Sequence, residues 1–515
     1  MARLHEYQSK ALLKEHGLPT PAGKPARSPD EAQQTAAELG RPVVVKAQVW
    51  VTGRAGLGGI KFAATPAQAA EAAAAILGTS IKGFTVETVL VEEKLALERE
   101  FYGGVIIDDI AQAPVVIFSR VGGTGIEQTA AADPGAVARH TVDIRAGLTD
   151  YQARNLVRQT GIHGQLQLQL GNALTKLYTV ARRFDARAAE INPIGLTGDG
   201  KLVAADCRIT VDDYAVYRHP ELGIEIAREF DRPPTPLEKI AWQVEANDYR
   251  GTFYFIQLEQ DYAPGNGVIG FHGAGGGGSM MSMDAVLNRG YRPANFVDTS
   301  GNPPASKVYR AAHIILSQPG LDGYFASGSG VASQEQFHSA RGLVKAFMEA
   351  PLTAPAVIRL GGNAEERAIA IIERARPHIP APVEAYGKDD SPDFCAERLQ
   401  ALLRQFRPPA EPPPGLTRPR PQTPYTFRTV SGGIVTFDHA ACLTCDTKIC
   451  IETCVPQILS LQNNAPVLNI SPEQAQKGGC IECLACDVEC YFEGNKGGRV
   501  DLPIPGLEAV RSTAA

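Results

Sequence analysis

The chain has 515 residues, of which 44% are hydrophobic and 21% are charged, so it can bury the cores of several domains and is not disordered throughout. A net charge of −6 gives no electrostatic reason to expect a nucleic-acid partner. No apolar run approaches the roughly 20 residues of a membrane helix, and the opening residues lack the apolar stretch of a secretory signal. We therefore expect a cytoplasmic protein with no membrane span.

Residues 1–230 alternate β-rich runs with amphipathic helical patterns. Apolar spacing predicts helices at 4–16 and 67–76, the second rich in alanine. Strands are predicted at 42–49, 88–92, 103–107 and 114–119. We take this stretch as the first α/β domain.

Charged residues lie toward the ends of two of these strands. Lys46 precedes the glycine-rich segment 53–59, and such a lysine can hold phosphate oxygens while loop N–H groups point at them. A surface lysine beside a flexible hairpin fits equally well. Glu92 and Glu100 can accept hydrogen bonds from an adenine amino group or ribose hydroxyls, although solvated strand-end charge is the simpler interpretation of either residue alone.

Three oxygen-bearing side chains, Glu190, Asn192 and Asp206, fall on two neighbouring predicted strands. Mg²⁺ binds to a few such hard oxygen ligands together with phosphates. Their apolar neighbours make them unusual strand residues, so we predict a functional site.

Residues 231–390 repeat a strand-then-helix pattern that predicts a doubly wound parallel sheet. Its strands are expected at 268–271, near 296, at 324–326 and at 356–360, and its helices at 305–318, 333–350 and 364–376. Glycine-rich turns at 270–278 and 325–331 would lie at the sheet edge where ligands bind. A helix N-terminus at Ser333 would favour an anion there.

Residues 391–428 comprise a helix and a proline-rich linker, with eight prolines among the 17 residues 408–424. This composition favours a stiff, extended chain. Residues 429–515 contain eight of the ten cysteines, and we predict a small α+β ferredoxin-like domain there.

The cysteines form two compact runs, and the second, C-x2-C-x2-C-x3-C, has the spacing of bacterial 4Fe–4S ligands, in which the fourth cysteine serves the other cluster. The predicted ligands are Cys442, Cys445, Cys450 and Cys490 for one cluster, and Cys454, Cys480, Cys483 and Cys486 for the other. Two zinc sites are the alternative, although zinc motifs usually consist of separated C-x2-C pairs. The clusters can carry electrons, or they can serve only to stabilise the fold of a small domain.

Several segments, taken in chain order, resemble the β subunit of the succinyl-CoA synthetase family. They are LHEYQSKALLKEHGLPTP, VVVKAQV, GRAGLGG, EINP and PANFVDTSGNPPASKVYRAAHIILS. The resemblance covers about the first 390 residues. It implies an ATP-grasp domain at 1–230 followed by a flavodoxin-like CoA-ligase domain at 231–390.

The same resemblance implies roles for individual residues. The nucleotide, ATP or GTP, is expected to contact Lys46, Gly53, Arg54, Ala55, Glu92, Leu95 and Glu100. Asn192 and Asp206 would hold Mg²⁺, and Glu190 would seat a phosphohistidine loop from a partner α subunit, which would also bind most of CoA. Lys46 and Glu190 are the expected catalytic residues.

The turns of the second domain depart from the family pattern. His272 stands where the family has an asparagine that helps to bind the acid, and the second turn reads Ser329-Gly330-Val331. These changes indicate an acid other than succinate, larger or differently polar. His272 itself can be a substrate contact, a structural histidine or a phosphorylated histidine.

The leading hypothesis is the β subunit of an ADP-forming acid–CoA ligase with an attached iron–sulfur domain. The second is an electron-transfer or scaffold subunit in which the ligase fold is not catalytic. A third joins them, with a thioester passed to an associated oxidoreductase. The cysteine tail also resembles ferredoxin-like partners of electron-transfer flavoproteins, which suggests a flavoprotein or another oxidoreductase as redox partner.

Overall fold

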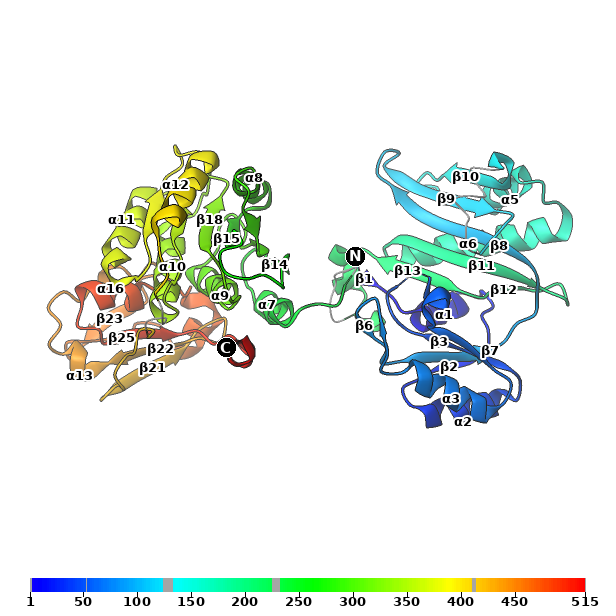
Figure 1. The fold of residues 1–515 in the computed structure, drawn as a ribbon, viewed down its shortest axis with the longest axis horizontal. Coiled ribbons are helices and arrows are strands. Elements are labelled where there is room, and N and C mark those ends of the chain that lie inside the picture. The colour runs from blue at the N-terminus through cyan, green and yellow to red at the C-terminus, as the bar shows by residue number, and fades with distance from the viewer. Residues whose placement is uncertain (1, 52, 124–132, 225–231, 410–413, 515) are drawn as a thin grey trace. The chain divides into compact units, whose positions relative to one another are not determined.

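The computed structural model describes residues 2–51, 53–123, 133–224, 232–409 and 414–514. The chain forms two compact units, unit 1 at Met1–Pro233 and unit 2 at Pro234–Ala515. Figure 1 shows the elements of each unit, and each unit is described here by itself.

Unit 1 contains a four-stranded antiparallel sheet in the order β2-β7-β3-β4. Its strands are β2 (Gly23–Ala26), β3 (Val43–Ala47), β4 (Ile60–Ala63) and β7 (Val89–Glu93). Helices α2 (Pro29–Leu39) and α3 (Pro66–Ile76) pack together and bury alanines against valines of β3. Ser28 and Thr65 cap these helices by accepting hydrogen bonds from the backbone N–H groups of Glu31 and Gln68.

A second, seven-stranded antiparallel sheet forms the rest of unit 1, in the order β1-β13-β11-β8-β9-β10 with β12 beside β11. The strands are β1 (Ala2–Arg3), β8 (Leu97–Asp108), β9 (Ala113–Ser119), β10 (Val137–Thr141), β11 (Ala186–Thr197), β12 (Leu202–Ala204) and β13 (Cys207–Val211). The helices are α1 (Glu6–Glu15), α5 (Asp150–Gln159) and α6 (Gly164–Arg183), and a small hairpin joins β5 (Ser80–Ile81) to β6 (Phe84–Thr85).

Unit 2 is built on a sheet in the order β14-β17-β15-β18-β19-β20, parallel except for β14, with the short β16 beside β15. The strands are β14 (Tyr254–Gln257), β15 (Val268–Ala274), β16 (Arg292–Pro293), β17 (Asn295–Asp298), β18 (Gly323–Gly328), β19 (Ala356–Arg359) and β20 (Val383–Tyr386). The five main parallel strands follow the order 2-1-3-4-5, and such sheets bind ligands beside the strand at which the order reverses, here β15.

Helices cover both faces of this sheet (Figure 1). One face carries α8 (Gly276–Leu287) and α12 (Pro392–Gln405), whose core includes Phe271, Phe325 and Leu399. The other carries α9 (Ala305–Leu316), α10 (Phe337–Glu349) and α11 (Glu365–Ala375), with α7 (Pro236–Ala246) beside α9.

The cysteine-rich segment packs against the α9–α11 layer and shares one continuous hydrophobic core with it. It contains a three-stranded sheet, β21 (Pro424–Arg428), β22 (Ile434–Asp438) and β25 (Gly498–Asp501), and a hairpin of β23 (Leu459–Gln462) and β24 (Ala465–Leu468). Its helices are α13 (His439–Cys442), α14 (Ile449–Glu452), α15 (Pro472–Gln474), α16 (Ala485–Glu493) and α17 (Leu507–Ala514).

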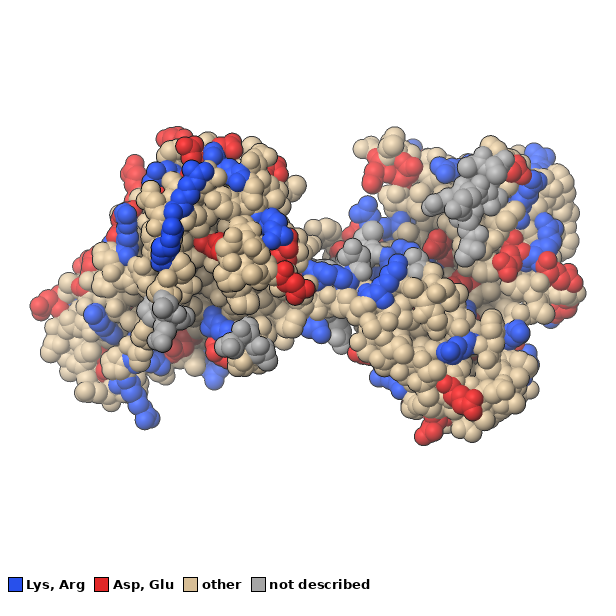
Figure 2. Space-filling model, viewed as in Figure 1, with Lys and Arg blue, Asp and Glu red and all other residues tan. Residues whose placement is uncertain are grey.

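The predicted helix start at Ser333 is wrong. Helix α10 begins at Phe337, because the preceding residues are tied to neighbouring loops. The N–H of Gln334 donates to the Asn302 side chain at 2.9 Å, and that of Gln336 donates to the Asn363 carbonyl at 2.8 Å. No helix among the described residues is long and apolar enough to cross a membrane. On the face shown in Figure 2, acidic and basic side chains are interspersed.

Candidate functional site

Six charged side chains form a network in unit 1, where helix α1 meets both sheets, and all of them are buried except Arg54 and Asp206, which are partly exposed. They are Glu6 and Lys10 of α1, Lys46 of β3, Arg54 of the short helix η1 (Arg54–Leu57), Glu92 of β7, and Asp206 between β12 and β13. The Lys46 ammonium lies 2.8 Å from Glu6 and 2.6 Å from Glu92, and Lys10 contacts the same two carboxylates at 2.8 and 2.6 Å.

Lys46 uses all of its hydrogen-bonding capacity in this state. An ammonium has three N–H donors, and those of Lys46 face Glu6, Glu92 and the Ala205 carbonyl. The contact with Ala205 is the longest, at 3.2 Å. A phosphate oxygen that binds Lys46 therefore has to replace one of these partners, and Ala205 is the one most easily displaced.

The network keeps most of its members charged. Burial disfavours the Glu6 carboxylate, but Lys46, Lys10 and Arg54 hold its pKa well below the usual range. Burial likewise disfavours the Lys46 ammonium, but Glu6 and Glu92 raise its pKa above the usual value. Asp206 differs, because burial and the nearby Glu6 carboxylate raise its pKa to about 6.

Three predicted nucleotide residues, Lys46, Arg54 and Glu92, belong to this network. Lys46 is 9% exposed and Glu92 is 2% exposed, so the surface-lysine alternative and, for Glu92, the solvated-charge alternative are wrong. Sequence reasoning missed Glu6 and Lys10, although their i,i+4 spacing on one helix is that of an ion pair.

The other predicted nucleotide residues lie outside the network. Gly53 has a φ of +73° and precedes η1, in which Ala55 is exposed. Arg54 donates to the Ala47 carbonyl at 2.8 Å, which holds this glycine-rich segment against β3. Leu95 is half-buried after β7, and Glu100 is exposed on β8.

The two predicted magnesium ligands are neighbours. The N–H of Asn192 on β11 donates to the Asp206 carbonyl at 3.0 Å. The Asn192 side-chain oxygen accepts from the Gly123 N–H at 2.6 Å, which fixes the amide and leaves that oxygen a second lone pair. The donor set is an amide oxygen and a carboxylate, the hard ligands that suit Mg²⁺.

Glu190 lies two residues before Asn192 on β11 but takes no part in the charge network. Its carboxylate accepts from the Tyr102 hydroxyl at 3.4 Å and lies 4.0 Å from Arg208. Its side chain is 37% exposed, so a second molecule can reach it.

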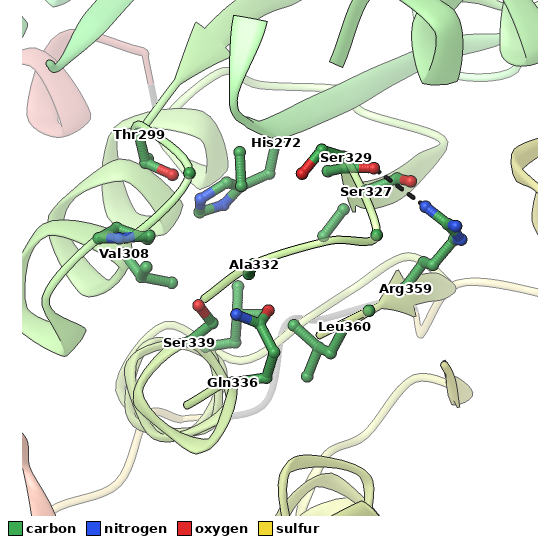
Figure 3. A pocket seen from close by; sticks show the side chains of 18 residues that line it. His272, Thr299, Val308, Ser327, Ser329, Ala332, Gln336, Ser339, Arg359 and Leu360 are labelled. Carbon is green, nitrogen blue, oxygen red and sulfur yellow. Dashed lines mark hydrogen bonds between the residues drawn. The ribbon is translucent and has the colours of Figure 1, made fainter. Parts of the chain in front are cut away.

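A pocket lies in unit 2 at the carboxyl ends of β15, β18 and β19 (Figure 3). Its polar side chains come from the three strands, from the loops that follow strands of the sheet and from the start of α10: His272, Thr299, Ser327, Ser329, Gln336, Ser339 and Arg359. Of the predicted acid-site residues, His272, Ser329 and Gly330 line it, whereas Val331 is 80% exposed and does not.

His272 is a neutral group in this pocket. It is 4% exposed, and burial lowers its pKa to about 3. Its Nδ1 lies 2.5 Å from the hydroxyl of Tyr324 on the neighbouring strand β18. The ring is therefore fixed and uncharged at physiological pH.

Arg359 shapes the pocket without offering a free cation. Its guanidinium donates to the carbonyls of Gly328 at 3.0 Å, Lys388 at 3.1 Å and Asp390 at 2.5 Å. A Cβ on Gly330 would lie 2.6 Å from this guanidinium, so the turn requires glycine there. Sequence reasoning missed Arg359, although it ends a predicted parallel strand, where ligand sites occur.

All ten cysteines are free thiols, and eight fall into two groups. Burial raises the pKa of Cys442 and of Cys450 to about 12, and the nearby thiols of Cys490 and Cys445 contribute in both cases. In the second group, burial raises the pKa of Cys480 to about 12, with contributions from Cys483 and Cys454. Burial also raises the pKa of Cys486, with contributions from these three thiols.

The second group surrounds a small cavity, which is lined by all four of its cysteines and otherwise mainly by apolar side chains such as Phe427, Ile458 and Val500. Glu482 and Leu484, between the cysteines, have φ values of +51° and +58°, which curl the loop around this space. Among the described residues, no group of three or more His, Cys, Asp or Glu side chains is arranged to hold a metal ion. A cluster spaces its thiolates more widely than a single ion, because iron and sulfide lie between them.

Comparison with known proteins identifies the first part of the chain. A family model described as an ATP-grasp domain matches residues 3–196. The chain is 39% identical over 383 residues to the β subunit of succinate–CoA ligase [GDP-forming] of Thermus thermophilus, covering 74% of this chain and 96% of that protein. It is 36% identical over 379 residues to the ADP-forming β subunit of Rubrobacter xylanophilus, covering 73% and 93%.

Among solved structures, ATP citrate lyase from Methanothrix soehngenii in complex with citrate and coenzyme A has a similar fold. The TM-score is 0.59 at 20% identity, covering 78% of this chain and 99% of that one. The predicted ATP-grasp domain and the family resemblance are thus confirmed. From the 39% identity over nearly the full length of a relative, the chain belongs to the succinate–CoA ligase β-subunit family, acid–thiol ligases in which it acts together with a partner subunit.

Proposed function

We propose that the chain is the β subunit of an ADP-forming type carboxylic acid–CoA ligase, in which a nucleotide phosphorylates a histidine of an α-type partner. The observation that supports this is the charge network, in which Lys10, Lys46 and Arg54 converge beside Asn192 and Asp206. Phosphoryl transfer depends mainly on positioning and on neutralising phosphate charge. ATP and GTP both suit this arrangement.

In this proposal, Lys46 and Arg54 bind phosphate oxygens while Glu6 and Glu92 hold both cations in place. Mg²⁺ held by Asn192 and Asp206 would neutralise further phosphate charge. The exposed carboxylate of Glu190, oriented by Tyr102, contacts the phosphohistidine loop of the partner.

A phosphate-transfer experiment tests the location of the histidine. The complex with an α-type subunit is incubated with γ-³²P-labelled nucleotide and separated by denaturing electrophoresis. Acid-labile, base-stable label is expected on the α-type subunit. Label on this chain that disappears in His272→Asn would instead make His272 the phosphorylated residue and overturn the proposal.

We further propose that residues 231–390 form a flavodoxin-like CoA-ligase domain whose pocket binds the acid, with CoA held mainly by the partner. The pocket is lined by neutral hydroxyl, amide and imidazole groups, and its arginine, Arg359, is bound to backbone carbonyls. This lining supports an acid that carries more hydrogen-bonding groups than succinate.

The variant His272→Asn should shift the acid preference. It replaces a neutral imidazole with a shorter amide, so the kcat/KM for succinate relative to the best acid should rise about tenfold. The measurement is CoA-dependent nucleoside diphosphate release with a panel of C2–C6 mono-, di- and tricarboxylic acids. Tyr324→Phe, which removes only the hydroxyl partner of His272, is the control. An unchanged order of acids in His272→Asn would show that His272 is structural.

Nucleotide binding should weaken as the pH falls below about 6. The pKa of Asp206 is raised above its ordinary value to about 6, so between pH 4 and 6 the folded chain keeps a proton that the unfolded chain has lost. That protonated form is favoured at low pH, and the ionised form that binds Mg²⁺ appears as the pH rises through 6. At pH 5, Mg–nucleotide affinity should be about tenfold lower than at pH 7.

Calorimetric titration of Mg–nucleotide at several pH values measures this effect. Asp206→Asn corrects for titration of the nucleotide itself, because any pH dependence that persists in this variant belongs to the phosphate. If the affinity for Mg–nucleotide changes equally with pH in the two proteins, Asp206 has no role in this pH dependence.

We also propose that the cysteine segment is a ferredoxin-like domain holding two 4Fe–4S clusters, with Cys442, Cys445, Cys450 and Cys490 on one and Cys454, Cys480, Cys483 and Cys486 on the other. The two thiol groups and the apolar cavity enclosed by the second group support this assignment. Such clusters supply one-electron transfer when bound. A flavoprotein or another oxidoreductase is the expected redox partner.

A second candidate function rests on the same cysteine groups: an electron-transfer or scaffold subunit in which the ligase fold is not catalytic. Anaerobic reduction of the complex distinguishes it. If a redox partner reduces the clusters while no acid supports CoA-dependent nucleotide cleavage, this second function holds. If both reactions occur, the ligase is catalytic and this second function is excluded.

A further inference from the structure

Helix α10 has two functional faces. Gln336, at its N-terminal end, and Ser339 and Leu343 line the acid pocket. Arg341 and Lys345 share a different face of α10, because they are four residues apart. Each of them lies two residues after a pocket residue, which places it on the opposite side of the helix. A single helix therefore separates the pocket from whatever Arg341 and Lys345 bind.

Those cations bind the helix that bears cysteines of both groups. Helix α16 carries Cys486 and Cys490 and packs against α10 (Figure 1). Arg341 lies 2.9 Å from Glu489, and Lys345 lies 2.7 Å from Asp487.

These ion pairs are deeply buried. The side chain of Arg341 is 0% exposed and that of Asp487 is 0% exposed. A buried cation that loses its partner is strongly destabilised, because no water replaces the lost contact. The position of α10 therefore depends on α16 remaining in place.

The position of α16 depends in turn on whether the cysteine groups hold their clusters. A small domain with so many metal-ligand cysteines draws much of its folding free energy from the bound group. With the clusters in place, α16 is fixed at two points, Cys486 and Cys490. Without them, α16 loses both of these anchors and keeps only its apolar packing and the ion pairs of Asp487 and Glu489.

We propose that Arg341 and Lys345 are positioning residues that make the acid pocket depend on occupation of the cysteine groups. Loss of the clusters releases Asp487 and Glu489, leaves Arg341 without its carboxylate partner and Lys345 with Glu349 alone, and displaces the pocket face of α10. Acid binding is then weakened while nucleotide binding in unit 1 is retained. This inference rests on the proposed ligase and cluster functions.

The first test removes iron from the full chain in complex with its α-type subunit, by anaerobic treatment with a chelator. Hydrogen exchange over α10 should become about tenfold faster. The KM for the acid should rise about tenfold while the KM for the nucleotide stays constant. If iron is present and its removal leaves both the exchange and the acid KM unchanged, the coupling is overturned while both proposed functions stand.

The second test breaks the contact without removing iron. Glu489→Gln should reproduce the faster exchange and the higher acid KM with iron content and visible absorbance unchanged, and Glu489→Asp should restore much of both. Arg398→Met, which breaks an ion pair with Glu384 on the other face of the same sheet, should change neither. If Glu489→Gln behaves as Arg398→Met does, Arg341 does not position the pocket. Protein that contains no iron from the start refutes the proposed clusters instead, and Glu489→Gln then tests the ionic contact alone.

Discussion

Replacing Lys46 with methionine is expected to lower nucleotide-dependent thioester formation about a thousandfold or more. The ammonium is the group shared by Glu6 and Glu92, and it carries the positive charge proposed to meet the phosphates. Without it, two buried carboxylates remain opposite Lys10 and Arg54, and they repel the incoming nucleotide. The measurement is steady-state release of nucleoside diphosphate by the complex.

Loss of stability has to be separated from loss of chemistry. The variant also breaks a buried ion pair, so its free energy of unfolding should fall by about 3–5 kcal/mol. Lys46→Arg keeps the charge and should retain stability better than activity, because a planar fork does not match three converging acceptors. Lys24→Met removes an exposed lysine paired with Glu38 and should change neither quantity. Turnover by folded Lys46→Met within threefold of the unaltered protein would remove Lys46 from the mechanism.

Replacing Cys483 with serine should remove one of two clusters and with it about four iron atoms per chain. Cys483 lines the apolar cavity together with the other three cysteines of its group. The group formed by Cys442, Cys445, Cys450 and Cys490 should keep its cluster unless α16 is released as well. The measurements are iron and sulfide content and the visible absorbance of anaerobically purified protein.

Cys395 provides a matched control. It is fully buried in α12 of the same unit but lies outside both cysteine groups. Cys395→Ser should leave the iron content unchanged. One zinc per group and no sulfide in the unaltered protein would establish the zinc alternative, and equal iron in Cys483→Ser and the unaltered protein would remove Cys483 from the ligand set.

Part of the candidate nucleotide site could be predicted from the sequence, because its charged residues lie within or beside short segments whose apolar pattern also predicts the strand. Lys46 follows a run of valines and precedes a glycine-rich segment, and the structure places it in β3 beside Glu92. Apolar spacing also predicts a helix over residues 4–16, where the structure has α1 (Glu6–Glu15). Glu6 and Lys10 were not recognised, because their partners come from β3 and β7, and only the folded chain brings these strands to α1.

Long-range packing explains what the sequence could not show. The proline-rich segment 408–424 was expected to separate the cysteine region from the parallel sheet, but the two share one hydrophobic core. Arg341 and Lys345 look like ordinary helix-surface cations until α16 covers them. Their partners, Asp487 and Glu489, are more than 140 residues away in the chain.

The most direct test of the account measures acid-dependent thioester formation by the anaerobically purified complex of this chain with its co-purifying α-type subunit. With nucleotide, Mg²⁺ and CoA present, at least one acid of the panel should yield stoichiometric acyl-CoA and nucleoside diphosphate, and Lys46→Met should abolish both. Absence of an α-type subunit together with no acid-dependent nucleotide cleavage would contradict the account and leave the chain as a scaffold for its cysteine domain.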